Sequence, residues 1–189
     1  MILFNANIIK NIKSGIFLES IGNKKPLFCK LSHKNDAVID IFAQYTMKNK
    51  KRIYNFTQGV MNDELIFADI DFDIPMVSFQ RFPYPEYHTS DDTLECISDK
   101  SLNETYNIVL KLINCLEANY IPVRQKKGPI YLSKHGLYKD ISNSRNKYWT
   151  NWRLMNLVGS NKSVLEISKE LDIDFWKLYE ILESYYNAG

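Results

Sequence analysis

Along the first hundred residues, apolar and polar positions follow in turn the two-residue period of strands and the longer period of helices. Two β-prone runs within residues 15–31 flank the turn formers Gly22–Pro26, which predicts a hairpin. Asp36 precedes apolar residues at helical spacing and is the expected N-cap of a helix. Further β-like runs occupy residues 52–56 and 73–82. This alternation of strand and helix favours an α/β fold.

The clearest amphipathic helix is predicted from Ser98 or Asp99 to Asn119. One of its faces collects apolar side chains and is expected to meet the core: Leu102, Tyr106, Val109, Leu110, Ile113 and Leu116. Residues 121–147 show no sustained period, as in an extended connection. We therefore expect a boundary near residues 140–147, between a partial α/β domain of residues 1–145 and a helical domain of residues 146–189.

The helical domain is predicted to contain three short helices, the first within residues 148–159. Ser163 and Glu166 have the spacing of a capping box that opens the second, and Asp174 can cap the third. The tight second turn suggests a helix-turn-helix unit of the winged-helix kind, and we expect the chain to end where a wing would begin. The third helix carries two glutamates, one lysine and no arginine, so an interaction or dimerisation module is expected rather than DNA binding.

The amino-acid composition mainly argues against particular classes of protein. Of 189 residues, 45% are hydrophobic and 24% charged, as in globular proteins, and the net charge of +2 provides no basic field for nucleic acid or acidic membranes. No apolar stretch approaches the ~18 to 20 residues of a membrane span, and the first residues lack a basic leader, so we expect a cytoplasmic protein. Cys29, Cys96 and Cys115 lack the C-x-x-C spacing and are expected to be reduced, mostly buried thiols.

The string Tyr87–Thr93 carries the most informative chemistry, because it contains H-T-x-x-D-T in a loop before a predicted helix. His88 can give an imidazole nitrogen to a metal ion, and the carboxylate of Asp92 can bond the other ring nitrogen or the loop backbone. The alternative from the spacing alone is a surface or structural histidine. His33 and His135 lack ligand-like neighbours and are expected to be of that kind.

Aromatic residues lie close to this string in the sequence: Phe79, Phe82, Tyr84 and Tyr87. Together with Arg81 they could form a pocket in which the guanidinium holds a substrate carboxylate and the rings supply apolar walls. The alternative is that these rings simply pack in the core.

The string YHTSDDT, together with the preceding pair Asp63–Glu64 and the run that contains Pro75, resembles the closing portion of the co-catalytic zinc aminopeptidases, the clan that also contains glutaminyl cyclases. The segments GIFLESIG, DIPMVSFQRFPYPEYHTSDDTLECIS and KHGLY resemble more closely a bacterial aminopeptidase-like group that is often associated with surface polysaccharide genes and ends in a winged helix. The resemblance implies that His88 is the last zinc ligand, that Asp63 lies beside the metal centre and that Tyr87 donates to a developing oxyanion. Glu64 replaces the histidine that usually follows the aspartate.

The same resemblance implies zinc ligands that we do not find in this chain. The clan uses a first His, a bridging Asp and a Glu–Glu pair, which belong upstream of residues 15–31. Zinc is therefore expected only if residues outside this chain complete the site. One hypothesis is that the chain is the C-terminal portion of a hydrolase of N-terminal peptide or related amide bonds. The other is a noncatalytic interaction or assembly protein that retains the fold.

Self-association or a partner subunit is expected under either hypothesis. A partial sheet leaves an unpaired edge, which favours pairing with another chain. The segment of residues 148–187 also carries more aromatic bulk than three short helices readily bury: Trp149, Trp152, Trp176, Tyr185 and Tyr186.

Overall fold

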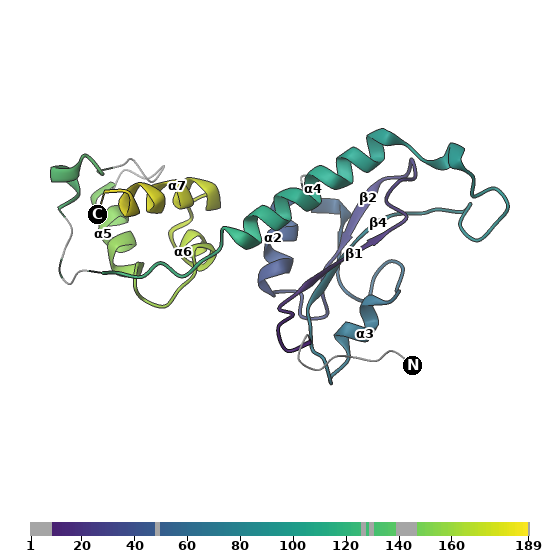
Figure 1. Cartoon of the computed structure of the whole chain (residues 1–189), viewed down its shortest axis with the longest axis horizontal. Helices are drawn as coiled ribbons and strands as arrows, with labels where there is room; N and C mark the ends of the chain where they lie inside the picture. Colours follow the sequence, from purple (N-terminus) through teal and green to yellow (C-terminus); the bar gives the residue numbers. More distant parts are fainter. Residues whose placement is uncertain (1–8, 48–49, 126–127, 129–130, 139–146, 189) are drawn as a thin grey trace. The chain divides into compact units, whose positions relative to one another are not determined.

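The computed structural model describes residues 9–47, 50–125, 128, 131–138 and 147–188 (Figure 1). It divides the chain into two compact units, Met1–Leu116 and Glu117–Gly189. The elements that begin in the first unit are, in chain order, β1 (Gly15–Glu19), β2 (Leu27–Lys30), α2 (Val38–Thr46), the 3-10 turn η1 (Lys50–Arg52), β3 (Ile53–Tyr54), α3 (Glu64–Ala68), β4 (Met76–Arg81), the 3-10 turn η2 (Leu94–Cys96) and α4 (Asp99–Glu117). This is the expected α/β composition.

The four strands form one sheet in the order β1-β4-β2-β3. The predicted hairpin within residues 15–31 is wrong, because β4 lies between β1 and β2 instead of leaving them paired. β4 runs parallel to β1, with Glu19 opposite Gln80, and antiparallel to β2. The physical reason is that five of the six residues of β4 are buried, so this strand is most stable with a neighbour on each side.

The pleat of the sheet separates an apolar face from a polar face. Residues that share one face include Leu27, Cys29, Val77 and Phe79, all of them at most 1% exposed. Burial and, to a lesser extent, the nearby Asp40 carboxylate together raise the pKa of the Cys29 thiol to about 12, as fits a reduced core cysteine. The other, more polar face carries Glu19, Lys30, Ser78 and Gln80 beside Phe17 and Phe28, and its buried polar side chains require partners.

Helix α2 forms where the period predicts it, but Asp36 is not its cap. The N-cap position is Ala37, and the carboxylate of Asp40 one turn later accepts from the backbone N–H of Ala37 at 3.0 Å. The same carboxylate accepts from the backbone N–H and the hydroxyl of Ser32, both at 2.6 Å. Asp40 therefore joins the start of α2 to the end of β2, a tertiary role that the local pattern did not contain.

Helix α4 forms within the predicted range but buries a different face. Its buried residues are Ser101, Thr105, Leu112 and Cys115, whereas much of the predicted face is exposed, with Tyr106 63% accessible. Ser101 and Thr105 turn toward the sheet because Arg81 donates to the carbonyl of Ser101 and to the hydroxyl of Thr105.

No helix in the described part of the chain is both long and apolar enough to cross a membrane.

The second unit contains η3 (Leu132–His135), α5 (Lys147–Leu157), α6 (Val164–Leu171) and α7 (Phe175–Tyr186), so all three predicted helices form. The second unit begins at Glu117, earlier in the chain than the boundary expected near residues 140–147. The segment just after α4 belongs with these helices, because the carbonyl of Tyr120 accepts from Val164 N–H at 2.9 Å and the side chain of Asn119 accepts from Leu165 N–H at 3.0 Å.

The caps of the last two helices are those predicted. Ser163 Oγ accepts from Glu166 N–H at 3.3 Å, and the Glu166 carboxylate accepts in return from Ser163 N–H at 2.7 Å. Asp174 accepts from the backbone N–H groups of Trp176 and Lys177 at 3.0 and 3.1 Å. In both caps the donor and the acceptor belong to residues only two or three positions apart, which explains why the amino-acid sequence is enough to predict them.

The capping box predicts a pH dependence of stability. The N–H and hydroxyl of Ser163 donate to Glu166 and hold the pKa of its carboxyl below the ordinary 4.5. Because the pKa of Glu166 is lowered in the folded chain, its contribution to the free energy of unfolding is complete above the ordinary pKa and is lost as pH falls through the folded pKa.

Tryptophan fluorescence can follow the unfolding of this part of the chain, because all three tryptophans lie in the second unit. Urea unfolding followed by tryptophan fluorescence should show a smaller loss of stability for Glu166→Gln than for the wild type between neutral pH and about pH 3. Glu180→Gln is the matched control and should behave like the wild type.

Candidate functional site

A pocket of about 100 Å³ lies where the parallel strands β1 and β4 end. The residues that line it come from these strand ends, from residue 60 and from the loop after β4: Glu19, Ser20, Val60, Gln80, Arg81, Phe82, Tyr84 and Tyr87. The carboxyl ends of parallel strands point their side chains and following loops to one edge, where α/β folds commonly bind ligands. Three of the four aromatic residues predicted for a pocket line it, whereas Phe79 is fully buried in the core.

Two polar side chains from the strand ends take part in a hydrogen-bonded network at the pocket. Glu19 Oε1 accepts from Asn62 Nδ2 at 3.1 Å, while Glu19 Oε2 is buried without a hydrogen-bond partner among the described residues. The amide nitrogen of Gln80 donates to the carbonyl of Val60 and to Ser78 Oγ, each at 3.0 Å. Both hydrogens of that amide are thus used, and its carbonyl oxygen is the group left to accept.

The loop after β4 carries the predicted H-T-x-x-D-T string. The imidazole of His88 stacks on the ring of Tyr87 with centroids 3.9 Å apart, and His88 has a left-handed backbone with φ of 62°. The hydroxyl of Tyr84 donates to Asp92, and this hydrogen bond together with partial desolvation raises the pKa of Tyr84 well above its ordinary range. The Asp92 carboxylate therefore accepts a hydrogen bond from Tyr84 in the same loop, and its predicted bond to His88 stays a prediction.

His88 is exposed and lies next to the pocket through Tyr87, which lines it. Among the residues that the structure describes, no group of three or more His, Cys, Asp or Glu side chains is arranged to hold a metal ion. A catalytic zinc ion usually has three protein ligands, so the described side chains do not by themselves fit a zinc site. Asp63 is also exposed, directly before α3 and three residues after the pocket residue Val60.

Glu64, which stands where the related motif has a histidine, is fully buried in an ion pair with Lys30. Lys30 also donates to the carbonyl of Val60 at 2.6 Å, and its ammonium lies 5.7 Å from the centre of the Phe56 ring. Val60 in turn lines the pocket. The pair therefore holds the segment between residues 60 and 64 against the polar face of the sheet.

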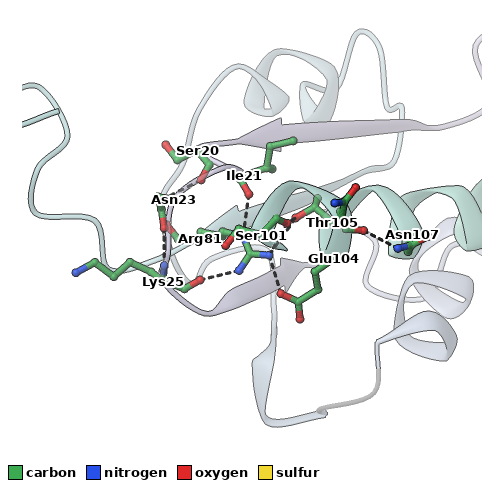
Figure 2. A network of polar contacts seen from close by, with 10 residues as sticks. Ser20, Ile21, Asn23, Lys25, Arg81, Ser101, Glu104, Thr105 and Asn107 are labelled. Carbon is green, nitrogen blue, oxygen red and sulfur yellow. Dashed lines mark hydrogen bonds and ion pairs between the residues drawn. The ribbon is translucent and has the colours of Figure 1, made fainter. Parts of the chain in front are cut away.

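Arg81 does not have the geometry predicted for substrate binding. Figure 2 shows its guanidinium surrounded by acceptors of the protein itself: the carbonyls of Ile21, Lys25 and Ser101 at 2.7 to 2.8 Å, the Glu104 carboxylate at 2.7 Å and the Thr105 hydroxyl at 3.3 Å. Only 3% of the side chain is exposed. Because each of its three nitrogens already donates to an acceptor of the protein, Arg81 joins α4 and the 20–25 turn to β4 instead of presenting a free cation to a ligand.

Sequence reasoning missed Glu19, Asn62 and Gln80. One signal was available for Glu19, since a carboxylate at the end of an apolar strand often faces a ligand site in α/β folds. No local signal marks Asn62 or Gln80, because their partners are distant in sequence: Asn62 and Glu19 are 43 residues apart.

Two comparisons with known proteins found a similarity. Residues 2–119 match a family model described as "Domain of unknown function (DUF4910)". A crystal structure of a "putative peptidase" from Clostridium acetobutylicum is similar with a TM-score of 0.75 and 23% sequence identity. The match covers 97% of this chain and 42% of that one, so the chain spans less than half of the length of its structural neighbour. No curated protein matches. The likeness shows an α/β fold shared with a protein of that name.

Proposed function

The chain belongs to the DUF4910 family, and we propose that it is the C-terminal portion of a zinc-dependent aminopeptidase-like hydrolase whose complete form acts on N-terminal peptide or related amide bonds. The observation that carries the proposal is the position of the Tyr87–His88 pair beside a pocket at the carboxyl ends of β1 and β4. The fold shared with the Clostridium protein supports it. We also propose a cytoplasmic location and, from the resembling bacterial group, a role in polysaccharide biosynthesis.

In this proposal Tyr87, His88 and Asp63 each have a separate role, which follows from the chemistry of the side chain. The phenol of Tyr87 can donate a hydrogen bond to negative charge that develops on a substrate carbonyl oxygen. His88 would be one zinc ligand, and Asp63 would bond groups around the metal from the start of α3. The other ligands would have to come from outside the described residues. We therefore assign no catalytic step to zinc.

His88→Ala in a full-length relative tests the metal role of this residue. Loss of one ligand is expected to lower zinc affinity at least about tenfold and to reduce aminopeptidase activity with it. His135→Ala is the matched control, since this histidine lies in η3 of the other unit and should leave both unchanged. Zinc content by mass spectrometry and hydrolysis of amino-acid amides give the two readouts. Unchanged zinc binding and activity in His88→Ala would remove His88 from the site.

The second candidate function is a noncatalytic interaction or assembly protein with a winged-helix-like C-terminal unit. Two exposed surfaces favour it: the stripe on α4 that includes Leu102 and Tyr106, and the pair Trp149 and Trp152 on α5, each 59% exposed. The two tryptophan rings contact each other edge to face at 5.6 Å between centroids. Tightly bound zinc with turnover in a full-length relative would favour the hydrolase. Absence of zinc and turnover in that relative, together with self-association of the purified chain in light scattering, would favour this second function.

A further inference from the structure

Charge is distributed unevenly along the second unit, although the whole chain is almost neutral. Residues 121–162 contain nine lysines and arginines and a single aspartate, whereas residues 163–189 contain two lysines and six acidic residues. The segment that includes α5 is therefore strongly basic, and the segment that forms α6 and α7 is acidic. The net charge of +2 conceals this separation, because a partner responds to the charges within about 8 Å of it at physiological salt.

The exposed face of α5 carries two tryptophans and an arginine. Trp149 is three positions before Trp152 and four before Arg153, so the helix places all three on one face, while Leu154 and Met155 are buried. Each tryptophan is 59% exposed. Their rings meet edge to face, at 86° between planes, and this arrangement leaves ring faces open to a planar group.

The cations beside these tryptophans are only partly compensated by the described carboxylates. Arg153 lies 3.9 Å from Glu170, and Lys162 is paired with the same carboxylate. One negative charge shared by two cations leaves a net positive charge, and the three side chains are all partly exposed. Helix α5 itself contains no Asp or Glu. The surface around Trp149 and Trp152 therefore favours an anionic partner.

The exposed rings distinguish among anionic partners. A membrane surface requires a wide apolar helix face, whereas the two rings on α5 lie between the exposed Arg153 and Asn156. An acidic protein surface would use the cations but leave the ring faces without flat groups to stack on. In a nucleic-acid duplex the bases are stacked on each other, but in a single strand they can stack on tryptophan while the phosphates approach Lys and Arg.

We infer that the α5 surface, formed by Trp149, Trp152 and Arg153, binds single-stranded nucleic acid. Unpaired bases stack on the two indole rings, and phosphates lie beside Arg153 and Lys162. This mode differs from insertion of α7 into a major groove, which the glutamates of that helix disfavour. The inference goes beyond the proposed hydrolase and depends on neither zinc nor turnover.

Fluorescence anisotropy of labelled strands of about 15 nucleotides, titrated with the full chain at about 50 mM salt, tests the inference. We expect saturable binding of oligothymidylate and oligouridylate, at least about tenfold tighter than binding of a DNA duplex of the same length. Binding should quench tryptophan fluorescence. It should also weaken with salt, with a slope of log affinity against log salt of about −0.7 for each phosphate contacted.

Variants of the α5 surface identify the groups involved. Trp149→Leu and Trp152→Leu should each weaken binding of the strands about tenfold, because each removes a stacking ring. Arg153→Met should weaken it several-fold and make the salt slope shallower by about 0.7. Tyr186→Leu is the matched control, since this ring is 76% exposed on the acidic α7 of the same unit, and it should bind like the wild type. Urea denaturation checks that each variant is folded.

Several results would overturn the inference without any variant: no saturable binding, equal affinity for strand and duplex, or equally effective competition by polyglutamate or by phosphatidylserine vesicles. Unchanged affinity in either folded tryptophan variant would do the same. Loss of self-association in light scattering of Trp149→Leu, with unchanged nucleic-acid binding, would assign the surface to contacts between copies of this chain instead. Zinc content and aminopeptidase activity are not among these readouts, so failure of the hydrolase proposal remains distinguishable.

Discussion

Arg81→Met should lower the free energy of unfolding of the first unit by about 3–5 kcal/mol, one of the two largest effects expected for a single substitution in this chain. The substitution removes the donor to the carbonyls of Ile21, Lys25 and Ser101 and leaves the Glu104 carboxylate without its cation. Methionine retains most of the buried volume, so the loss reports the polar network more than a cavity.

The measurement is urea denaturation followed by far-UV circular dichroism, with Arg153→Met as the matched control. The Arg153 side chain is 52% exposed and lies 3.9 Å from Glu170, so its loss should change stability by no more than about 0.5 kcal/mol. Hydrogen exchange should locate the damage in the 20–25 turn and the first turns of α4, which Arg81 joins in Figure 2. A variant as stable as the wild type would return Arg81 to the substrate-binding role that the sequence suggested.

Breaking the buried pair of Lys30 and Glu64 should be equally destabilising. Lys30→Met leaves Glu64 charged and without its cation where its accessibility is 0%, and Glu64→Leu leaves the Lys30 ammonium buried with the carbonyl of Val60 and the face of the Phe56 ring. Each single substitution should lower the free energy of unfolding by about 3–5 kcal/mol, because the remaining charge has lost its compensation.

The double variant Lys30→Met with Glu64→Leu distinguishes the attraction between the two charges from the free-energy cost of removing them from water. Removing both charges leaves an apolar contact of similar size, so the double variant should be considerably more stable than either single variant. The four proteins form a double-mutant cycle that urea denaturation can measure. Losses that simply add in the double variant would show that the two charges do not stabilise each other. The cycle also bears on the pocket, since the pair holds the segment that contains Val60.

Local patterns predicted those features whose causes lie within one element. Helices α2, α4, α5, α6 and α7 form close to their predicted positions, because apolar spacing is repeated along each of them. The caps Ser163–Glu166 and Asp174 were predictable for the same reason, since donor and acceptor are two or three residues apart. Part of the pocket was predictable as well, because Phe82, Tyr84 and Tyr87 are close neighbours on one loop.

Other features were not predictable because alternatives with the same local pattern exist. Helix α4 has apolar residues over a wide arc, and periodicity cannot say which part of that arc meets the sheet. The guanidinium of Arg81, 20 residues away from Ser101, decides it. The runs around Gly22–Pro26 likewise fit a hairpin until β4, about fifty residues later in the chain, takes the place between them.

The α/β class, the positions of the helices, two helix caps and the string that contains Tyr87, His88 and Asp92 can be found in the amino-acid sequence, because they depend on residues within a few positions of one another. The strand order, the structural role of Arg81 and the position of Glu19 opposite Gln80 at a pocket become known from the folded chain alone. These depend on which distant segments pair, and that choice is made by burial and hydrogen bonding across the whole sheet. The unpaired oxygen of Glu19 could be recognised only after Asn62, 43 residues away, had been placed on the other oxygen.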